Sequence, residues 1–467
     1  MSHDPPGPGF WASVRESLRG SRHDYTTGPL GRAILLLAVP MVLEMVMESV
    51  FAVVDIFFVG KVGPAAVATV GLTETIVIIV YTIAFGLSIG IAAMVSRRIG
   101  EKDPDGAAHT AIQGIWLGAL VSIPLAIVGV AAGPSLLALM GAGPDVLAIG
   151  TGYARILLGG NVVILLIFII NAAFRGAGDP AIAMRVLWLG NGINIVLNPC
   201  LILGLGPFHR FGVTGSAIAT LIGRGSGVVY QFWALRRGAG NLVVRRAHIA
   251  PDLPLMGRIL KLSGAATLQN FIGSASWIGL MRVIAPFGSE VVAGYTIAIR
   301  VIIFVMLPSW GLSNAGSTLV GQSLGAGKPE RAEEASWRAA IYNFVFLGLF
   351  GVLFVAAAPR IVGLFTPDVA AVAVGSRALL IIGMGLPVFA YAMVLSNAFN
   401  GAGDTWTPTW MNFACFWLFE VPSAWWLATR AGWGPDGVFA AITIAFTVYA
   451  VVAVALFKQG KWKRVAV

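Results

Sequence analysis

Apolar segments long enough to cross a bilayer follow one another along almost the whole chain. A bilayer core requires about 20 apolar residues in helical conformation. Twelve segments between charged or Gly/Pro-rich breaks meet this length, at 33–58, 65–95, 108–132, 147–172, 181–205, 212–236, 257–284, 291–320, 334–358, 370–397, 407–430 and 436–458. The pattern therefore predicts an all-α integral membrane protein with twelve transmembrane helices.

Internal sequence similarity divides these spans into two halves. The motif "AFRGAGDP" at 173–180 recurs as "AFNGAGDT" at 398–405, and "GLS" at 86–88 recurs at 311–313, each 225 residues later. Each half holds six spans, so both halves enter the membrane in the same orientation, as in carriers built from parallel repeats. We expect two six-helix lobes forming a V with a central cleft. Their predicted boundaries are 31–236 for the N-lobe, 237–256 for a cytoplasmic linker and 257–458 for the C-lobe.

The positive charge of the chain reports orientation in the membrane. The sequence has 467 residues, of which 57% are hydrophobic and 11% charged, with a formal net charge of +10. Lys and Arg concentrate in alternate loops, which places these loops and both termini in the cytoplasm. Residues 1–30 lack the apolar segment of a signal peptide and are expected, with 459–467, to be cytoplasmic tails. This reading excludes nucleic acid as the partner and favours a prokaryotic inner membrane.

The stretch "GFWASVRESL" within the first tail leaves two possibilities open. It places Phe10, Trp11, Val14 and Leu18 near one helical face, which suits a helix on the membrane surface. A disordered tail fits the same composition.

Three carboxylates interrupt the first span. At 100° per residue, Glu44, Glu48 and Asp55 share one helical face. An acid at the centre of a span costs roughly 2.5–3.5 kcal/mol on insertion scales, so this face must look into the protein or a water-filled cavity. The acids could load protons or hold a cation, or they could be neutralised by fixed partners such as Arg224 or Arg300.

Further polar residues within spans are candidates for binding a substrate. Glu74 lies deep in the second span, and Gln269 and Asn270 lie in the seventh. Glu420, in "FWLFEVPSAWW", has aromatic neighbours that suit an organic cation, although a Trp-rich segment is also typical of a membrane interface. Pro40 removes a backbone hydrogen bond and predicts a kink in the first helix.

Several motifs together resemble the multidrug and toxic compound extrusion (MATE) family. They are "VVDIFFVGKVGPAAVATVGL" after the acidic helix, "AFRGAGDP", its echo "AFNGAGDT", and "GVTGSAIAT" at the start of the sixth span. The resemblance covers about residues 30–458. It implies a two-lobed antiporter that alternates between inward-open and outward-open forms and expels organic cations in exchange for protons or sodium.

The resemblance also implies roles for individual residues. Asp55 matches the aspartate of the first helix that is implicated in cation coupling. Asn194 matches an asparagine of the fifth span, but Asn198 stands where the family pattern has an aspartate facing the first acid. Because Asn carries no charge, either Glu48 or Glu44 supplies the missing charge, or the site works with protons alone. Asn194 and Asn198 could instead make hydrogen bonds that pack helices.

The seventh span lacks the carboxylate expected in the branch with a C-lobe cation site, so the resemblance favours the branch with its site in the N-lobe. The leading prediction is export of organic cations by a monomer without cofactor or metal site, with H+ favoured as the coupling ion and Na+ possible. A flippase for lipid-linked substrates is the alternative, and it predicts a basic cavity. An intramembrane enzyme is disfavoured because the five histidines lie in tails, loops or span ends.

Overall fold

The computed structural model describes residues 9–20, 23–238 and 240–466, and these are almost entirely helical. The first half contains α1 (Phe10–Arg19), α2 (Leu30–Gly60), α3 (Pro64–Gly100), α4 (Pro104–Leu139), α5 (Pro144–Gly159), α6 (Asn161–Gly176), α7 (Pro180–Leu203) and α8 (Val213–Arg237). The second half contains α9 (Leu253–Ile284), α10 (Ser289–Gly325), α11 (Pro329–Gly363), α12 (Val369–Ala402), α13 (Trp406–Asn412), α14 (Val421–Trp425) and α15 (Pro435–Lys458). Five short helical segments lie after or between these helices: η1 (Arg246–Ile249), η2 (Ala285–Phe287), η3 (Phe413–Glu420), η4 (Trp426–Arg430) and η5 (Lys461–Arg464).

All twelve predicted spans are helical. Within the described residues, nine helical segments are long and apolar enough to cross a membrane, with α5 and α6 meeting at Gly160 to form one of them. The remaining predicted spans are α8, α9 and the run from α13 to η4. Polar and charged residues such as Arg224 lower the hydropathy of α8, Arg258 and Lys261 do so at the start of α9, and wide π-helical turns divide the third run.

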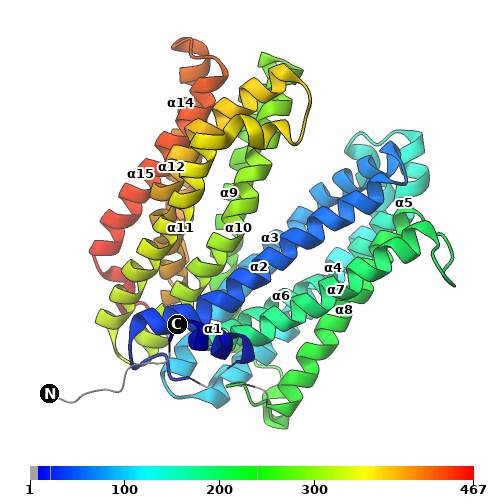
Figure 1. The fold of residues 1–467 in the computed structure, drawn as a ribbon. Helices are drawn as coiled ribbons and strands as arrows, with labels where there is room; N and C mark the ends of the chain where they lie inside the picture. The colour runs from blue at the N-terminus through cyan, green and yellow to red at the C-terminus, as the bar shows by residue number, and fades with distance from the viewer. Residues whose placement is uncertain (1–8, 21–22, 239, 467) are drawn as a thin grey trace.

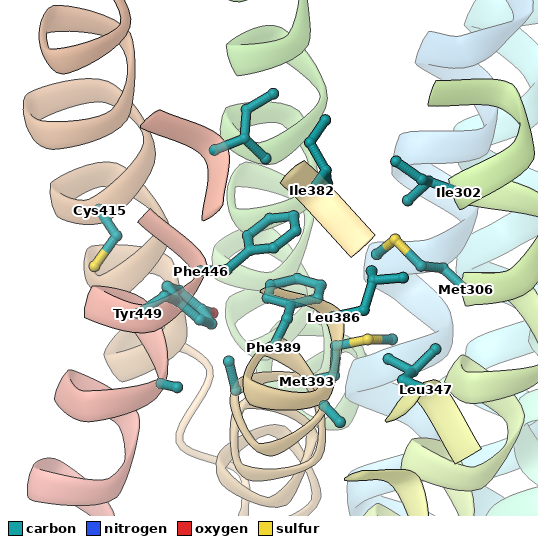
Figure 2. Packing of buried hydrophobic residues seen from close by; sticks show 14 of the residues in the cluster. Ile302, Met306, Leu347, Ile382, Leu386, Phe389, Met393, Cys415, Phe446 and Tyr449 are labelled. Atoms are coloured by element: carbon teal, nitrogen blue, oxygen red, sulfur yellow. The ribbon is translucent and has the colours of Figure 1, made fainter. Parts of the chain in front are cut away.

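The helices form two bundles that meet at one end and diverge at the other, giving a V (Figure 1). Helices α2 to α8 form the N-lobe and α9 to α15 the C-lobe. Each lobe has its own apolar core. In the C-lobe core, Phe389 stacks on Phe446 with ring centroids 4.0 Å apart, and Tyr449 packs beside them (Figure 2). The predicted all-α, two-lobed fold is confirmed.

At the narrow end of the V, the start of α2 packs against the C-lobe and the start of α9 packs against the N-lobe. The first half of α2 packs with residues of α10, α11 and α12, in a cluster that includes Leu37, Met41 and Leu319. Conversely, Met256 and Ile259 at the start of α9 belong to the N-lobe core. Because α2 and α9 each open one half of the duplicated sequence, this crossing repeats the same packing twice and ties the lobes together.

The segments outside the spans are docked on the bundle. The tail preceding α2 contains the helix α1, so the disordered alternative is wrong for Phe10–Arg19. In the linker, the Gln113 side chain donates to the carbonyls of His248 and Ala250. After α15, the Trp462 side chain is fully buried and stacks on Phe457. The described residues of the linker and of the C-terminal tail therefore pack against the helices.

Candidate functional site

The acidic face of α2 points into the N-lobe, as the helical periodicity predicts. Glu44 and Asp55 are buried, and Glu48 keeps about a quarter of its side chain exposed (23%). Their partners come from α6, α7 and α8, which pack around the second half of α2. Pro40 lies inside the helix just before this acidic stretch.

Glu44 forms a buried ion pair. The Arg175 guanidinium of α6 donates to Glu44 Oε1 at 2.8 Å, and the Asn171 amide donates to the same oxygen at 3.3 Å. Gln231 of α8 in turn donates to Asn171 Oδ1 at 2.7 Å. This network neutralises Glu44 within the protein, and the sequence did not indicate Arg175 as its partner.

Glu48 is also paired with an arginine. Arg224 of α8 donates to Glu48 Oε1 at 2.8 Å, and Asn191 of α7 donates to Oε2 at 3.0 Å. The Arg224 guanidinium is buried and lies 5.5 Å from the ring centroid of Phe51 and 5.6 Å from that of Tyr81. The sequence left open that Arg224 or Arg300 neutralises an acid of this face. Arg224 does so for Glu48, whereas Arg300 forms no ion pair among the described residues.

Asp55 has only neutral partners. Asn198 of α7 and the Ser216 hydroxyl of α8 each donate to Asp55 Oδ1 at 2.6 Å. No Lys, Arg or His of the described ranges forms an ion pair with it. Asn198 thus faces Asp55 as the resemblance implied. Asn194 instead donates to Thr220 at 3.0 Å and does not contact the acid.

The arrangement separates the three acids by chemistry. A buried carboxylate is costly unless a counter-charge, a proton or a metal ion compensates it. Arginines supply the counter-charge to Glu44 and Glu48, but Asp55 has two hydrogen-bond donors and no positive charge. Asp55 is consequently the member of this face that is open to neutralisation by a proton or a cation.

A cavity of about 360 Å³ lies between the lobes. Its C-lobe wall contains the predicted residues Gln269, Asn270 and Glu420, and its N-lobe wall includes Arg175. The C-lobe also contributes Phe389, Ser396, Asn412, Phe416, Phe446 and Tyr449 to the lining of this cavity. Asp55, Glu48, Glu44 and Glu74 do not line this cavity. Glu74 is exposed on α3, so it does not share the pocket with the other proposed substrate-binding residues.

Glu420 is the acid of this cavity. It ends the π-helical segment η3, is only 2% exposed, and its carboxyl group has no hydrogen bond or ion pair to any other described residue. Wide π-helical turns are common at functional sites. Tyr449 and Phe416, stacked with ring centroids 5.2 Å apart, line the same pocket. A second buried acid without an ion pair among the described residues thus lies in the C-lobe, beside aromatic side chains.

The duplication relates the two sets of polar residues. Gln269 lies 225 residues after Glu44, and Ser396 lies 225 after Asn171. Their contacts are equivalent: the Asn171 amide donates to Glu44 at 3.3 Å, and the Gln269 amide donates to Ser396 at 3.4 Å. The C-lobe copy also holds Asn400 where Arg175 stands in the N-lobe. An ion pair in one lobe is therefore a neutral polar cluster in the other.

The sequence indicated Arg224 and Asn198 as partners of the acids, but not the other partners on α6 to α8. Arg175 and Asn171 lie in and just before the repeated motif "AFRGAGDP", and Asn191 begins the segment that contains Asn194 and Asn198. Ser216 lies in "GVTGSAIAT". Polar residues in or near these motifs could therefore have been proposed as partners of the acids, but which acid each of them contacts depends on tertiary packing.

Two lobes related by duplication, joined at one end and lining a polar cavity, define a multi-span membrane transporter fold. The MatE family model matches residues 40–200 and 265–426, which cover most of both lobes. The chain therefore belongs to the MatE family.

Individual relatives match over nearly their full length. "Probable multidrug resistance protein YoeA" of Bacillus subtilis (strain 168) is 26% identical over 438 residues, covering 93% of this chain and 94% of that protein. "Probable multidrug resistance protein NorM" of Thermotoga maritima is 24% identical over 444 residues, covering 93% and 94%. A solved structure described as the outward-facing conformation of a multidrug resistance MATE family transporter has a TM-score of 0.87 at 26% identity, covering 93% and 96%.

Proposed function

We propose that this protein exports organic cations in exchange for protons by alternating access. The observation that carries the proposal is two buried acids of the spans that form no ion pair with the described residues, Asp55 in the N-lobe and Glu420 in the C-lobe cavity. Two relatives carry names that refer to multidrug resistance, which supports export of drugs.

Asp55 is the proposed coupling residue. When it is charged, Asn198 and Ser216 stabilise the carboxylate by hydrogen bonds at 2.6 Å. Protonation removes the charge and weakens these bonds, so the packing of α2 against α7 and α8 becomes sensitive to the proton. Because Asn198 adds no second negative charge beside Asp55, a proton fits this site better than Na+, which remains the alternative ion. An ion site at Asp55 would assign the chain to the branch with its ion site in the N-lobe, and the absence of an ion pair at Asp55 among the described residues supports this assignment.

The interlobe cavity is the proposed binding site for the cargo. A monovalent organic cation there would approach the Glu420 carboxylate with its charge and stack its rings on Phe389, Phe416 or Tyr449. Gln269 and Asn412 add polar groups for less specific contacts. Aromatic side chains mixed with many polar groups suit flat, charged molecules that differ in shape.

We place the wide end of the V outside the cell and both termini in the cytoplasm. The basic residues of alternate loops support this orientation, and the joined ends of the lobes lie on the same side as the described ends of the chain (Figure 1). The likeness to an outward-facing MATE structure supports the same assignment. A prokaryotic cell membrane and a monomeric carrier complete the proposal.

A flippase for lipid-linked pyrophosphates is less well supported. Such cargo needs unpaired basic groups in the cavity, whereas Arg175, the arginine of its wall, is already paired with Glu44 at 2.8 Å. The acid Glu420 would repel a pyrophosphate at close range. The charges of the cavity therefore favour cations.

The test is transport of ethidium by purified protein in proteoliposomes. A pH gradient and a sodium gradient would be imposed separately, with Asp55→Asn and Glu420→Gln as variants and the exposed Asp145→Asn on α5 as the matched control. We expect the pH gradient to drive ethidium movement in the native chain and in Asp145→Asn. Asp55→Asn should abolish gradient-driven movement.

The two acids should differ in what they lose. Glu420→Gln should weaken ethidium binding about tenfold or more, because a charge-assisted contact is worth roughly 1.5–3 kcal/mol. The affinity of the Asp55→Asn variant for ethidium should change much less. Movement driven by neither gradient would refute cation export. Movement driven by sodium alone would overturn the choice of ion.

A further inference from the structure

The short segment 23–28, which we name the N-terminal strap, connects α1 to α2 across the narrow end of the V. It is not helical, but its shape is fixed locally. Asp24 Oδ1 accepts hydrogen bonds from the Thr26 backbone N–H at 2.9 Å and from the Thr26 hydroxyl at 2.6 Å. This side-chain-to-backbone turn presents the carbonyl groups of the strap on one side.

The C-lobe binds these carbonyls through Lys328, in the turn between α10 and α11, and through Arg331, in the first turn of α11. The Arg331 guanidinium donates to the carbonyls of Tyr25 at 2.8 Å, Thr27 at 2.8 Å and Gly28 at 2.8 Å. Lys328 donates to the Thr26 carbonyl at 2.9 Å. Four consecutive carbonyls of the strap are thus held by two cationic side chains of the C-lobe.

The N-lobe holds the same strap from the opposite direction. Lys102, between α3 and α4, pairs with Asp24 Oδ2 at 2.8 Å. The Tyr25 side chain is 3% exposed, and its ring covers Gly178 in the turn between α6 and α7, where an added Cβ would lie 2.8 Å from the ring. The six-residue strap as a whole therefore contacts both lobes.

We propose that the N-terminal strap is a latch that holds the narrow end of the V closed. The turns carrying Lys102 and Gly178 belong to the N-lobe, whereas those carrying Lys328 and Arg331 belong to the C-lobe. Separating the lobes at this end must break one set of contacts. The latch biases the carrier toward the form that is open at the wide end, and its release is a step of each return to the inward-open form.

This inference rests on the alternating-access part of the proposed function, but its test needs no cargo. Spin labels on the exposed positions 236 and 330 would report the distance between the lobes at the narrow end, in a chain with Cys200 and Cys415 replaced by alanine. The full chain would be studied in lipid nanodiscs. Failure of ethidium transport would leave this measurement unaffected.

The following variants distinguish loss of the strap contacts from a general loss of fold stability. Arg331→Ala should raise the fraction of long distances several-fold, and Arg331→Lys should raise it less. Arg338→Ala, which removes an exposed ion pair with Glu334 on the same helix, is the matched control and should leave the distances unchanged. Thermal unfolding of each variant would show that the fold is retained.

A double variant tests whether the two anchors act through one strap. Lys102→Ala should also raise the long-distance fraction, and combining it with Arg331→Ala should add little, because either change already frees one end of the bridge. Unchanged distances in Arg331→Ala would overturn the proposal. Fully additive effects of the two changes would also overturn it, since they would indicate independent contacts.

Discussion

Glu44, Glu48 and Asp55 lie on one face of α2 but have different neutralising partners. Arginines from α6 and α8 pair with the first two, whereas Asp55 receives hydrogen bonds from uncharged groups. A residue that must exchange a proton during each cycle cannot also have a permanent counter-charge at contact distance, because the ion pair would hold it in the charged form. The chemistry of the partner therefore distinguishes a structural acid from an ion-coupling one.

The periodicity of the sequence predicted the shared face, and the resemblance predicted that Asn198 faces Asp55. Neither of them could show which of the three acids binds a proton or cation and which is neutralised by an arginine. Arg175 and Arg224 lie more than a hundred residues from the acids that they neutralise, and one of them was not considered. Pairing at this range depends on how α6 and α8 pack around α2, which local patterns do not encode.

The first prediction concerns the pair Glu48–Arg224. Arg224→Ala removes the partner of Glu48 and leaves an uncompensated carboxylate, so we expect the free energy of unfolding to fall by about 3 kcal/mol. This is the lower end of the usual range because Glu48 keeps part of its contact with solvent. Thermal unfolding in detergent would measure the loss. Arg300→Ala, at an exposed arginine of α10, should leave the melting temperature nearly unchanged; equal losses in both variants would contradict the assignment.

At the scale of elements, length and hydropathy predicted the positions of all twelve helical segments, because a helix that crosses the bilayer needs about 20 apolar residues. The predictions missed the changes within spans. Gly160 divides the fourth span, and η3 and η4 widen the eleventh. Such irregular turns depend on neighbouring helices that satisfy the backbone. The wide turns nevertheless matter for function, because η3 ends at Glu420.

The second prediction concerns Pro40 in α2. The first half of this helix packs on the C-lobe and the second half carries the acidic face of the N-lobe, so bending near Pro40 would move one lobe relative to the other. Pro40→Ala restores a backbone hydrogen bond and stiffens this junction. We expect a several-fold slower transport rate with nearly unchanged ethidium binding.

Proteoliposome transport and equilibrium binding of the same preparation would separate these quantities. Pro124→Ala, at an exposed proline inside α4, is the control for a general effect of proline removal and should keep the native rate. If Pro40→Ala transports at the native rate, the junction does not need to bend during the cycle.

At the scale of the whole molecule, the duplication predicted the two lobes and the V. It did not predict that equivalent helices would cross between lobes at the narrow end, nor that the strap would be docked there. The crossing itself follows the repeat: Gly100 lies against the Gln322 backbone, and Gly325, 225 residues later, lies against the Arg97 backbone. Internal similarity identifies the segments that share a structure, whereas the packing of one copy on the other depends on tertiary contacts.

The third prediction concerns the close approach of the lobes at this end. Gly100 closes α3 against the backbone of Gln322 in α10, so that an added Cβ would overlap the Gln322 carbonyl. Because the obstacle is backbone and cannot rotate away, Gly100→Ala must push α3 and α10 apart. We expect a shift toward the form that is open at the narrow end, measured as longer distances between labels at positions 236 and 330.

The matched control is Gly348→Ala, within the C-lobe, where the added Cβ meets Pro387 at an ordinary 3.8 Å. It should leave the distances unchanged. The strap and the glycine contact oppose opening at the same end, so combining Gly100→Ala with Arg331→Ala should favour the open form more than either change does alone. If Gly100→Ala keeps the native distances between the labels at positions 236 and 330, the interface between α3 and α10 can accommodate the added methyl group. The strap rather than close packing would then hold this end shut.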